Sequence, residues 1–242
     1  MLFFQSPPPT RFDLRFSLFG IPVRVHPLFW LIALILGSSG SPIDIMIWIL
    51  VVFVSVLIHE LGHALAFRTY GQDSHIVLHM GGGLTIPEAV SWGGGYANVA
   101  PSPMQQIIII LAGPFTGFLS AALVIAGVNL LGGTVDLFPI PHLTSFPVEN
   151  YLAIRFVGLM LWVNVVWGVF NLMPVFPLDG GQIARTILIQ YDPFDGARKS
   201  LWLSVIVGAL IALFGVLFSQ IYIALIFGLL AFQSYQSLSI RY

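Results

Sequence analysis

Two histidines, His59 and His63, stand four residues apart in the apolar run VLIHELGHALAF, and Glu60 directly follows the first of them. On a helix, this spacing places both imidazoles on one face. Two imidazoles supply half of a tetrahedral zinc site, and a hydrolytic site keeps one position for water. A neighbouring carboxylate can take a proton from that water, which makes Glu60 the candidate general base. The pattern therefore predicts one catalytic Zn²⁺ ion per chain.

The alternative is a pair of core histidines beside a buried carboxylate in a helix bundle. An unpaired charge is costly inside a bilayer, and Glu60 has no basic neighbour on its own helix before Arg68. A metal ion explains the cluster better than ordinary core packing does.

A third ligand is expected from a second motif, NLMPVFPLDGG at 171–181. Pro174 and Pro177 break the preceding helix, so we expect Asp179 to be the N-cap of a new one. The spacing leaves open whether Asp179 binds the metal, caps the helix or does both. The competing candidates are loop glutamates and histidines more typical of strands or loops: Glu88, Glu149, His75 and His79.

The composition predicts a membrane protein. Of 242 residues, 57% are hydrophobic and 8% charged, and the mean hydropathy is +0.95. A net charge of -1 offers no basic surface for nucleic acid, so no such partner is expected. The chain has no cysteine, which leaves histidine and carboxylate as strong ligands for a transition metal. The N-terminus lacks the pattern of a cleavable signal peptide, so we expect all segments to be retained.

Membrane-spanning helices need about 20 mainly apolar residues. Six are expected, at about 26–40, 43–67, 104–131, 151–172, 201–218 and 221–236. Only Ser219 and Gln220 separate the last two, which form either one long helix or a hairpin, and the hairpin fits the length better. The predicted fold class is an α-helical polytopic membrane protein, organised as a single domain over residues 1–242.

The segment 68–103 is rich in glycine and too polar to span a membrane. Its alternating run HIVLHM, followed by GGGLTIP and WGGGYANV, predicts short strands joined by glycine turns. Such backbone is tolerated at membrane depth where protein buries it or water reaches it. Residues 11–25 also alternate, which predicts a further strand or an interfacial segment.

The basic residues predict the orientation. With six spans and both termini in the cytoplasm, every Lys and Arg except Arg155 falls on the cytoplasmic side. Arg155 lies near the outer end of its span, where a long side chain can reach the interface. The expected location is a bacterial inner membrane, which rests on size and analogy rather than on any residue.

The motifs HELGH at 59–63 and NLMPVFPLDGG at 171–181 together resemble the paired signature of the site-2 protease family of intramembrane zinc metalloproteases. In that family, two histidines and an aspartate bind zinc and a glutamate activates water. The resemblance implies these roles for His59, His63, Asp179 and Glu60. It also implies that Asn171, which matches the asparagine of the second motif, positions substrate.

Further segments share the resemblance. GIPVRVHPLFW at 20–30 is similar to the start of the family's first span, and GGGLTIP to its membrane-inserted loop. We expect an unwound substrate helix to pair along Gly81 to Ile86, with Gly81, Gly82 and Gly83 forming either an opening for water or a plain flexible turn. LAGPFTGFL resembles a family segment in which an asparagine often follows; Gly117 stands at that position here. The spacing leaves no room for the family's PDZ or CBS domains, which implies a minimal form.

The resemblance implies an enzyme of regulated intramembrane proteolysis, which hydrolyses peptide bonds in or near transmembrane segments of membrane-protein substrates. The substrate's own helix, the glycine-rich loop and separate regulatory partners would then select the substrate. Three rivals remain: a divalent-metal transporter, a zinc protease with a glutamate as third ligand, and an inactive scaffold. The transporter would need more ligands along its pore, whereas apart from Asp179 the spans offer mainly asparagines. The intact motif argues against the scaffold.

Overall fold

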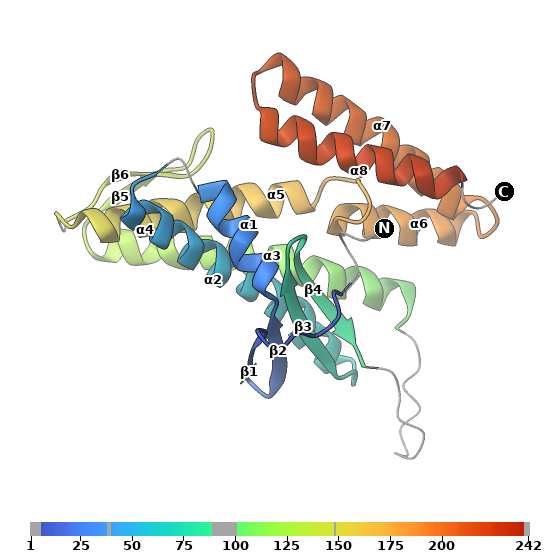
Figure 1. Cartoon of the computed structure of the whole chain (residues 1–242), viewed down its shortest axis with the longest axis horizontal. Helices are drawn as coiled ribbons and strands as arrows, with labels where there is room; N and C mark the ends of the chain where they lie inside the picture. Colours follow the sequence, from blue (N-terminus) through green and yellow to red (C-terminus); the bar gives the residue numbers. More distant parts are fainter. Residues whose placement is uncertain (1–5, 38–39, 89–100, 148, 240–242) are drawn as a thin grey trace. The chain divides into compact units, whose positions relative to one another are not determined.

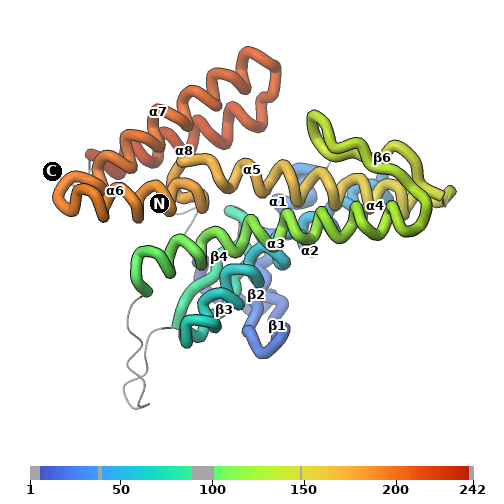
Figure 2. The backbone as a smooth tube through the Cα atoms, turned by 180° about the vertical axis from the view of Figure 1, so that it is seen from behind, coloured from blue at the N-terminus to red at the C-terminus, as the bar shows by residue number. Residues whose placement is uncertain are grey.

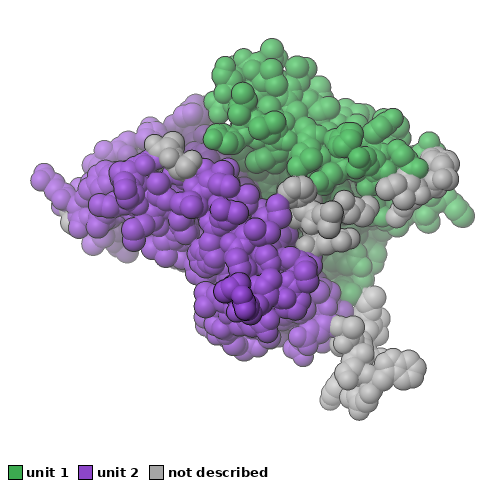
Figure 3. Space-filling view, viewed as in Figure 1, with its two compact units in different colours: residues 1, 101–110, 170–242 green, residues 2–100, 111–169 purple. Residues whose placement is uncertain are grey.

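The computed structural model describes residues 6–37, 40–88, 101–147 and 149–239. The chain forms two compact units, shown in different colours in Figure 3. Unit 1 contains Pro101–Ile110 and Phe170–Tyr242, and unit 2 contains Leu2–Ala100 and Leu111–Val169. The fold is mostly helical with a small sheet (Figure 1).

The sheet of unit 2 has the strand order β1 (Leu14–Leu18), β2 (Ile21–Val25), β3 (Ser74–His79), β4 (Gly82–Pro87). The pairs β1/β2 and β3/β4 are antiparallel, and β2/β3 is parallel. A two-residue turn joins β1 to β2, and both of its residues, Phe19 and Gly20, have positive φ. The strands expected in HIVLHM, GGGLTIP and the N-terminal alternating segment are confirmed, whereas WGGGYANV lies outside the described residues.

Helices α1 (Pro27–Gly37) and α2 (Pro42–Thr69) connect the parallel strands β2 and β3, because parallel neighbours require a crossover. A capping box starts α2: the Ser41 hydroxyl accepts from the Asp44 amide, and the Asp44 carboxylate accepts from the Ser41 amide. The C-terminal half of α2 then packs on the sheet through one apolar core of alternate strand residues and helix residues: Ile21, Val23, Val25, Ile76, Leu78, Val56, Leu57, Leu61 and Ala64. This core fixes the HELGH segment on the sheet.

A carboxylate also ties the first described residues to this sheet. Asp13 accepts a hydrogen bond from Arg24 of β2 at 3.1 Å and another from the Thr10 hydroxyl at 2.6 Å. Burial disfavours the charged form, but these hydrogen bonds outweigh it and lower the pKa of Asp13 to about 2. Asp13 therefore stays charged near neutral pH and keeps its ion pair with Arg24.

Within the described residues, five helical segments are long and apolar enough to cross a membrane: α2, α3 (Pro103–Leu130), Tyr151–Asn171, α7 (Gly196–Leu217) and α8 (Ile221–Ser239). The segment Tyr151–Asn171 consists of α4 (Tyr151–Trp162), the π-helical η2 (Val163–Trp167) and α5 (Gly168–Asn171). The polytopic helical membrane fold is thus confirmed. The expected span at 26–40 is the shorter α1, whose 11 residues cover about 16 Å of a hydrocarbon core about 30 Å thick.

The N-terminal ends of α2 and α4 are joined by polar contacts. Asp44 Oδ1 accepts a hydrogen bond from Arg155 Nε at 3.2 Å and another from the Tyr151 hydroxyl. Arg155, the exception to the charge count, is therefore paired with an acid. Between α3 and α4 lies a small hairpin of β5 (Thr134–Asp136) and β6 (His142–Ser145), which the sequence did not indicate.

Unit 1 contains α6 (Asp179–Tyr191) and the pair α7 and α8, which run side by side as a hairpin (Figure 2). Small residues let these two helices approach closely. A Cβ on Gly208 would lie 3.1 Å from the Ala231 Cβ, and a Cβ on Gly215 would lie 3.1 Å from the Ala224 Cβ. The close approach along both helices explains why the hairpin forms instead of one long helix.

Candidate metal centre

Helix α2 presents the candidate ligands inside unit 2. His59, Glu60 and His63 are 6%, 5% and 8% exposed. The two Nε2 atoms lie 3.1 Å apart, and one ligand atom from each of the three residues lies within 4.8 Å of the others. The expected convergence of the two imidazoles on one helix face is therefore present.

The two imidazoles fit a zinc ion. Nitrogen ligands at 2.0–2.1 Å from a tetrahedral ion are about 3.3 Å apart, close to the spacing of these Nε2 atoms. Without a cation, two neutral rings can share only one hydrogen bond there, since each has one N–H. Both nitrogens can instead direct lone pairs at one cation, and the carboxylate of Glu60 would help to balance the charge of that cation.

Helix α3 passes directly behind the imidazoles. A Cβ on Gly113 would collide with His63 and would lie 2.8 Å from His59 Nε2. On α2, a Cβ on Gly62, the residue directly before His63, would collide with the Ala112 carbonyl and the Thr116 hydroxyl. Glycine at 62 and 113 thus allows α2 and α3 to touch at the level of the histidines.

We expect Gly113→Ala to reduce zinc affinity about 10- to 100-fold, because the added methyl group displaces both imidazoles from their present positions. Gly127→Ala is the matched control on α3, because a Cβ there meets nothing within 4 Å. Zinc titration of the two purified variants measures the difference. Equal affinity in both variants would contradict the assigned close contact.

Glu60 faces strand β4. The Thr85 hydroxyl lies 2.7 Å from Glu60 Oε2 and 3.0 Å from the Glu60 carbonyl oxygen. A Cβ on Gly83 would collide with the Glu60 carboxylate, so that side chain lies against bare backbone. The candidate base is held between α2 and the sheet.

The turn before β4 is held by a histidine. His79 is 3% exposed, and its Nδ1 accepts a hydrogen bond from the Gly81 amide at 3.1 Å. Burial lowers the pKa of His79, and the charges of His26 and Arg24 act in the same direction. His79 therefore serves as a neutral acceptor, and its hydrogen bond fixes Gly81 directly before β4, which begins with Gly82 and Gly83.

The predicted third ligand, Asp179, lies in unit 1 at the first residue of α6 and is 7% exposed. The prediction that Asp179 is the N-cap is wrong. Leu178 is the N-cap: its backbone is extended, and its carbonyl accepts the first helical hydrogen bond from Gln182. Asp179 still stands in the first turn, where the helix dipole favours a negative charge. Its role as a metal ligand stays a prediction.

The loop before Asp179 is tightly packed within unit 1. A Cβ on Gly180 would collide with the Leu172 carbonyl, and one on Gly181 with the backbone of Val175. The amide of Phe176 donates to the Ser204 hydroxyl of α7 at 2.9 Å. Two glycines and a buried serine therefore fix the approach to Asp179.

The competing ligands lie away from the histidines. Glu88 follows the end of β4, its side chain is 53% exposed, and it faces His75 at 3.9 Å. Glu149 precedes Tyr151, whose hydroxyl contacts Asp44. Asp44 stands fifteen helical residues before His59 on α2, a distance of about 22 Å. The structure thus gives neither glutamate a place beside the two imidazoles.

Two asparagines lie on the fourth span. Asn171, the predicted substrate residue, ends α5 and is half-buried in unit 1. Asn164, in η2 of unit 2, is 3% exposed and donates to the Ser55 hydroxyl at 3.0 Å. Its Oδ1 would lie 3.7 Å from a Cβ on Gly117, so Asn164 borders the position where the resembling family often has asparagine.

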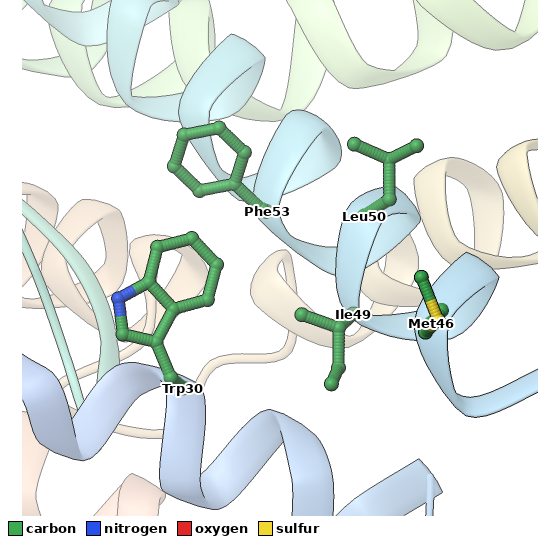
Figure 4. A pocket seen from close by; sticks show the side chains of 5 residues that line it. All are labelled: Trp30, Met46, Ile49, Leu50 and Phe53. Atoms are coloured by element: carbon green, nitrogen blue, oxygen red, sulfur yellow. The ribbon is translucent and has the colours of Figure 1, made fainter. Parts of the chain in front are cut away.

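Unit 2 also has an apolar hollow of about 400 Å³ between α1 and α2 (Figure 4). Trp30, Met46, Ile49, Leu50 and Phe53 line it. None of these five side chains is a histidine, a carboxylate or a cysteine, the usual ligands of zinc, so the hollow is not an extension of the metal centre.

The sequence profile of peptidase family M50 matches residues 47–149 and 131–215, which include both the HELGH motif and Asp179. The chain belongs to peptidase family M50. The match confirms the resemblance to the site-2 protease family that the two motifs predicted. This M50 chain is also similar to a solved site-2 protease from Methanocaldococcus jannaschii. The TM-score is 0.57 at 26% identity, over 94% of this chain and 95% of the other.

The curated relatives are longer proteins, of which this chain matches a part. This M50 chain is 31% identical to zinc metalloprotease MJ0392 from Methanocaldococcus jannaschii, over 84% of the chain and 52% of the relative. It is 31% identical to a putative zinc metalloprotease from Synechocystis, over 72% and 43%. It is 27% identical to stage IV sporulation protein FB from Bacillus subtilis, over 74% and 52%. The chain thus spans about half the length of these relatives.

Proposed function

We propose that this chain is an intramembrane zinc metalloendopeptidase that hydrolyses peptide bonds in or near transmembrane segments of membrane proteins. The carrying observation is the convergence of His59 and His63, with Glu60 beside them, inside an apolar helix long enough to span a membrane. Membership of family M50 and the names of the zinc metalloprotease relatives support the proposal.

We propose that His59, His63 and Asp179 hold one Zn²⁺ ion. The spacing of the two Nε2 atoms supports the histidine part, and the burial of Asp179 in the first turn of α6 supports the third ligand. When bound, the ion would polarise the scissile carbonyl and make a water molecule acidic enough to lose a proton near neutral pH.

Glu60 then moves the protons. Its carboxylate accepts a proton from the attacking water and returns it to the amine that leaves when the peptide bond breaks. Thr85 and the backbone at Gly83 hold this carboxylate, so it needs little reorganisation before it reacts.

The substrate would bind as an added strand. A helix's own hydrogen bonds shield its peptide bonds, whereas an extended segment exposes them. Strand β4 is last in the sheet order, and among the described residues its strand partner is β3, so its other edge has no strand partner there. We assign Gly81, Gly82 and Gly83 to substrate pairing and Asn171 to substrate positioning, and we propose substrates with a transmembrane helix and a separate regulatory membrane protein as partners.

The proposed orientation places both termini in the cytoplasm of a bacterial cell, with the protein in the inner membrane. The distribution of Lys and Arg supports it. This orientation requires α1 to cross the membrane. Local thinning of the bilayer accommodates a helix that is shorter than the hydrocarbon core.

Single cysteines in this cysteine-free chain test the orientation. We expect a membrane-impermeant maleimide to label His142→Cys and Gln220→Cys in intact cells, because both positions are exposed and lie on the proposed outer side. Asp195→Cys should react only after permeabilisation. Labelling of Asp195→Cys in intact cells would overturn the orientation.

Co-expression with candidate single-span membrane proteins tests the function. The wild type should cut its substrate, and Glu60→Gln should retain the uncut protein as a stable complex. A divalent-metal transporter gives the opposite pattern: zinc uptake into vesicles that survives Glu60→Gln, with no cleavage. That result would replace the protease assignment.

A further inference from the structure

A single threonine on the sheet contacts the proposed base. Thr85 Oγ1 lies 2.7 Å from Glu60 Oε2 and 3.0 Å from the Glu60 carbonyl oxygen. A hydroxyl has one proton to donate, and a carboxylate is a stronger acceptor than a neutral carbonyl. The proton therefore goes to the side chain of Glu60.

The alternation of side chains along β4 explains why Gly83 also contacts Glu60. Residues two apart on a strand share a face, so Gly83 and Thr85 both point toward Glu60. A Cβ at Gly83 would collide with Glu60 Oε1, whereas at Thr85 the side chain reaches Oε2. One face of the strand thus offers bare backbone to one carboxylate oxygen and a hydroxyl to the other.

The strand that carries Thr85 is held by a buried neighbour. Thr85 pairs with Ile76 and Leu84 with Val77, and both β3 residues are fully buried. The hydroxyl is therefore presented from the packed sheet, which limits the positions that it can adopt.

We infer that Thr85 is the positioning residue for the general base: it holds Glu60 Oε2, which leaves Oε1 to exchange the proton with water and the leaving amine. The inference rests on the proposed function and names a residue that controls the geometry of its base. In this role the Thr85 hydroxyl acts through Glu60, whereas the backbone of β4 is left to pair with substrate.

The test compares Thr85→Val, which keeps the shape but removes the hydroxyl, with Thr85→Ser, which restores the hydroxyl. We expect Thr85→Val to lower kcat about 10- to 100-fold, with KM and zinc content unchanged, and Thr85→Ser to recover most of the rate. Thr69→Val is the matched control, because Thr69 is exposed and its hydroxyl donates only within its own helix, to Ala66. If Thr85→Val is unstable, Thr85→Ala replaces it.

Two further readouts separate positioning from folding. In a Glu60→Gln background, Thr85→Val should cause little additional loss, because no base remains to be positioned. In the wild type, the carboxylate infrared band assigned by difference from Glu60→Gln should shift in Thr85→Val and return in Thr85→Ser. An unshifted band, or wild-type kcat in Thr85→Val, would overturn the role of Thr85.

The same experiments distinguish the two proposals. If the wild type cleaves and Glu60→Gln does not, while Thr85→Val keeps full activity, the positioning inference fails and the protease assignment stands. If the wild type cleaves nothing, the protease assignment fails, and the positioning role of Thr85 in catalysis is overturned with it. A shifted carboxylate infrared band of Glu60 in Thr85→Val would then establish only the contact between Thr85 and Glu60.

Discussion

Glu60→Gln is expected to lower kcat about 10²- to 10⁴-fold while leaving the zinc content unchanged. Glutamine keeps the shape of glutamate and can still accept the Thr85 hydrogen bond, but its amide cannot take a proton from water. The expected loss corresponds to about 3–5 kcal/mol of transition-state stabilisation.

The measurement is single-turnover cleavage by purified protein in vesicles, with zinc determined by elemental analysis of the same samples. Glu88→Gln is the matched control, because Glu88 is a glutamate in the same unit with a largely exposed side chain. Cleavage at the wild-type rate by Glu60→Gln would remove Glu60 from the chemistry. Loss of zinc together with activity would instead make it a ligand.

Asp179→Ala is expected to lose both zinc and cleavage. Removing one of three protein ligands weakens a zinc site more than removing a residue that only supports a ligand, which costs about 10- to 100-fold. The affinity should therefore fall by more than about 100-fold, and Asp179→Ala should purify with little zinc.

Elemental analysis after dialysis checks this expectation, with Glu88→Ala and Glu149→Ala measured in parallel. These two variants should keep the zinc of the wild type, since both glutamates lie away from the histidines. Full zinc in Asp179→Ala, with loss in either glutamate variant, would assign the third ligand to that glutamate.

Local patterns made several parts of the fold predictable from the sequence. The four-residue spacing of His59 and His63 fixes a common helix face, whatever the helix packs against. Alternation in HIVLHM, followed by the glycines of GGGLTIP, likewise predicts two strands joined by a glycine turn, because the side chains of a strand alternate between its two faces. Apolar runs revealed the long helices, since a bilayer sets their minimum length.

Contacts between distant segments were not predictable in this way. Thr85 gave no signal as a functional residue, because its importance depends on how β4 lies against α2. Gly113 stood in a quoted motif, but only packing shows that its missing side chain makes room for the imidazoles. The N-cap assignment of Asp179 was wrong by one residue, because polar residues favour that position while backbone geometry places the apolar Leu178 there.

The hydrogen bond from the Phe176 amide to Ser204 has a consequence for biosynthesis. Translation reaches Phe176 twenty-eight residues before Ser204. A growing chain therefore contains Asp179 before it contains Ser204, the residue that holds the loop preceding Asp179. In a ribosome-bound chain that ends between these two residues, the loop before Asp179 would lack its hydrogen bond to Ser204. The loop before Asp179 therefore reaches its final structure only after α7 has been synthesised.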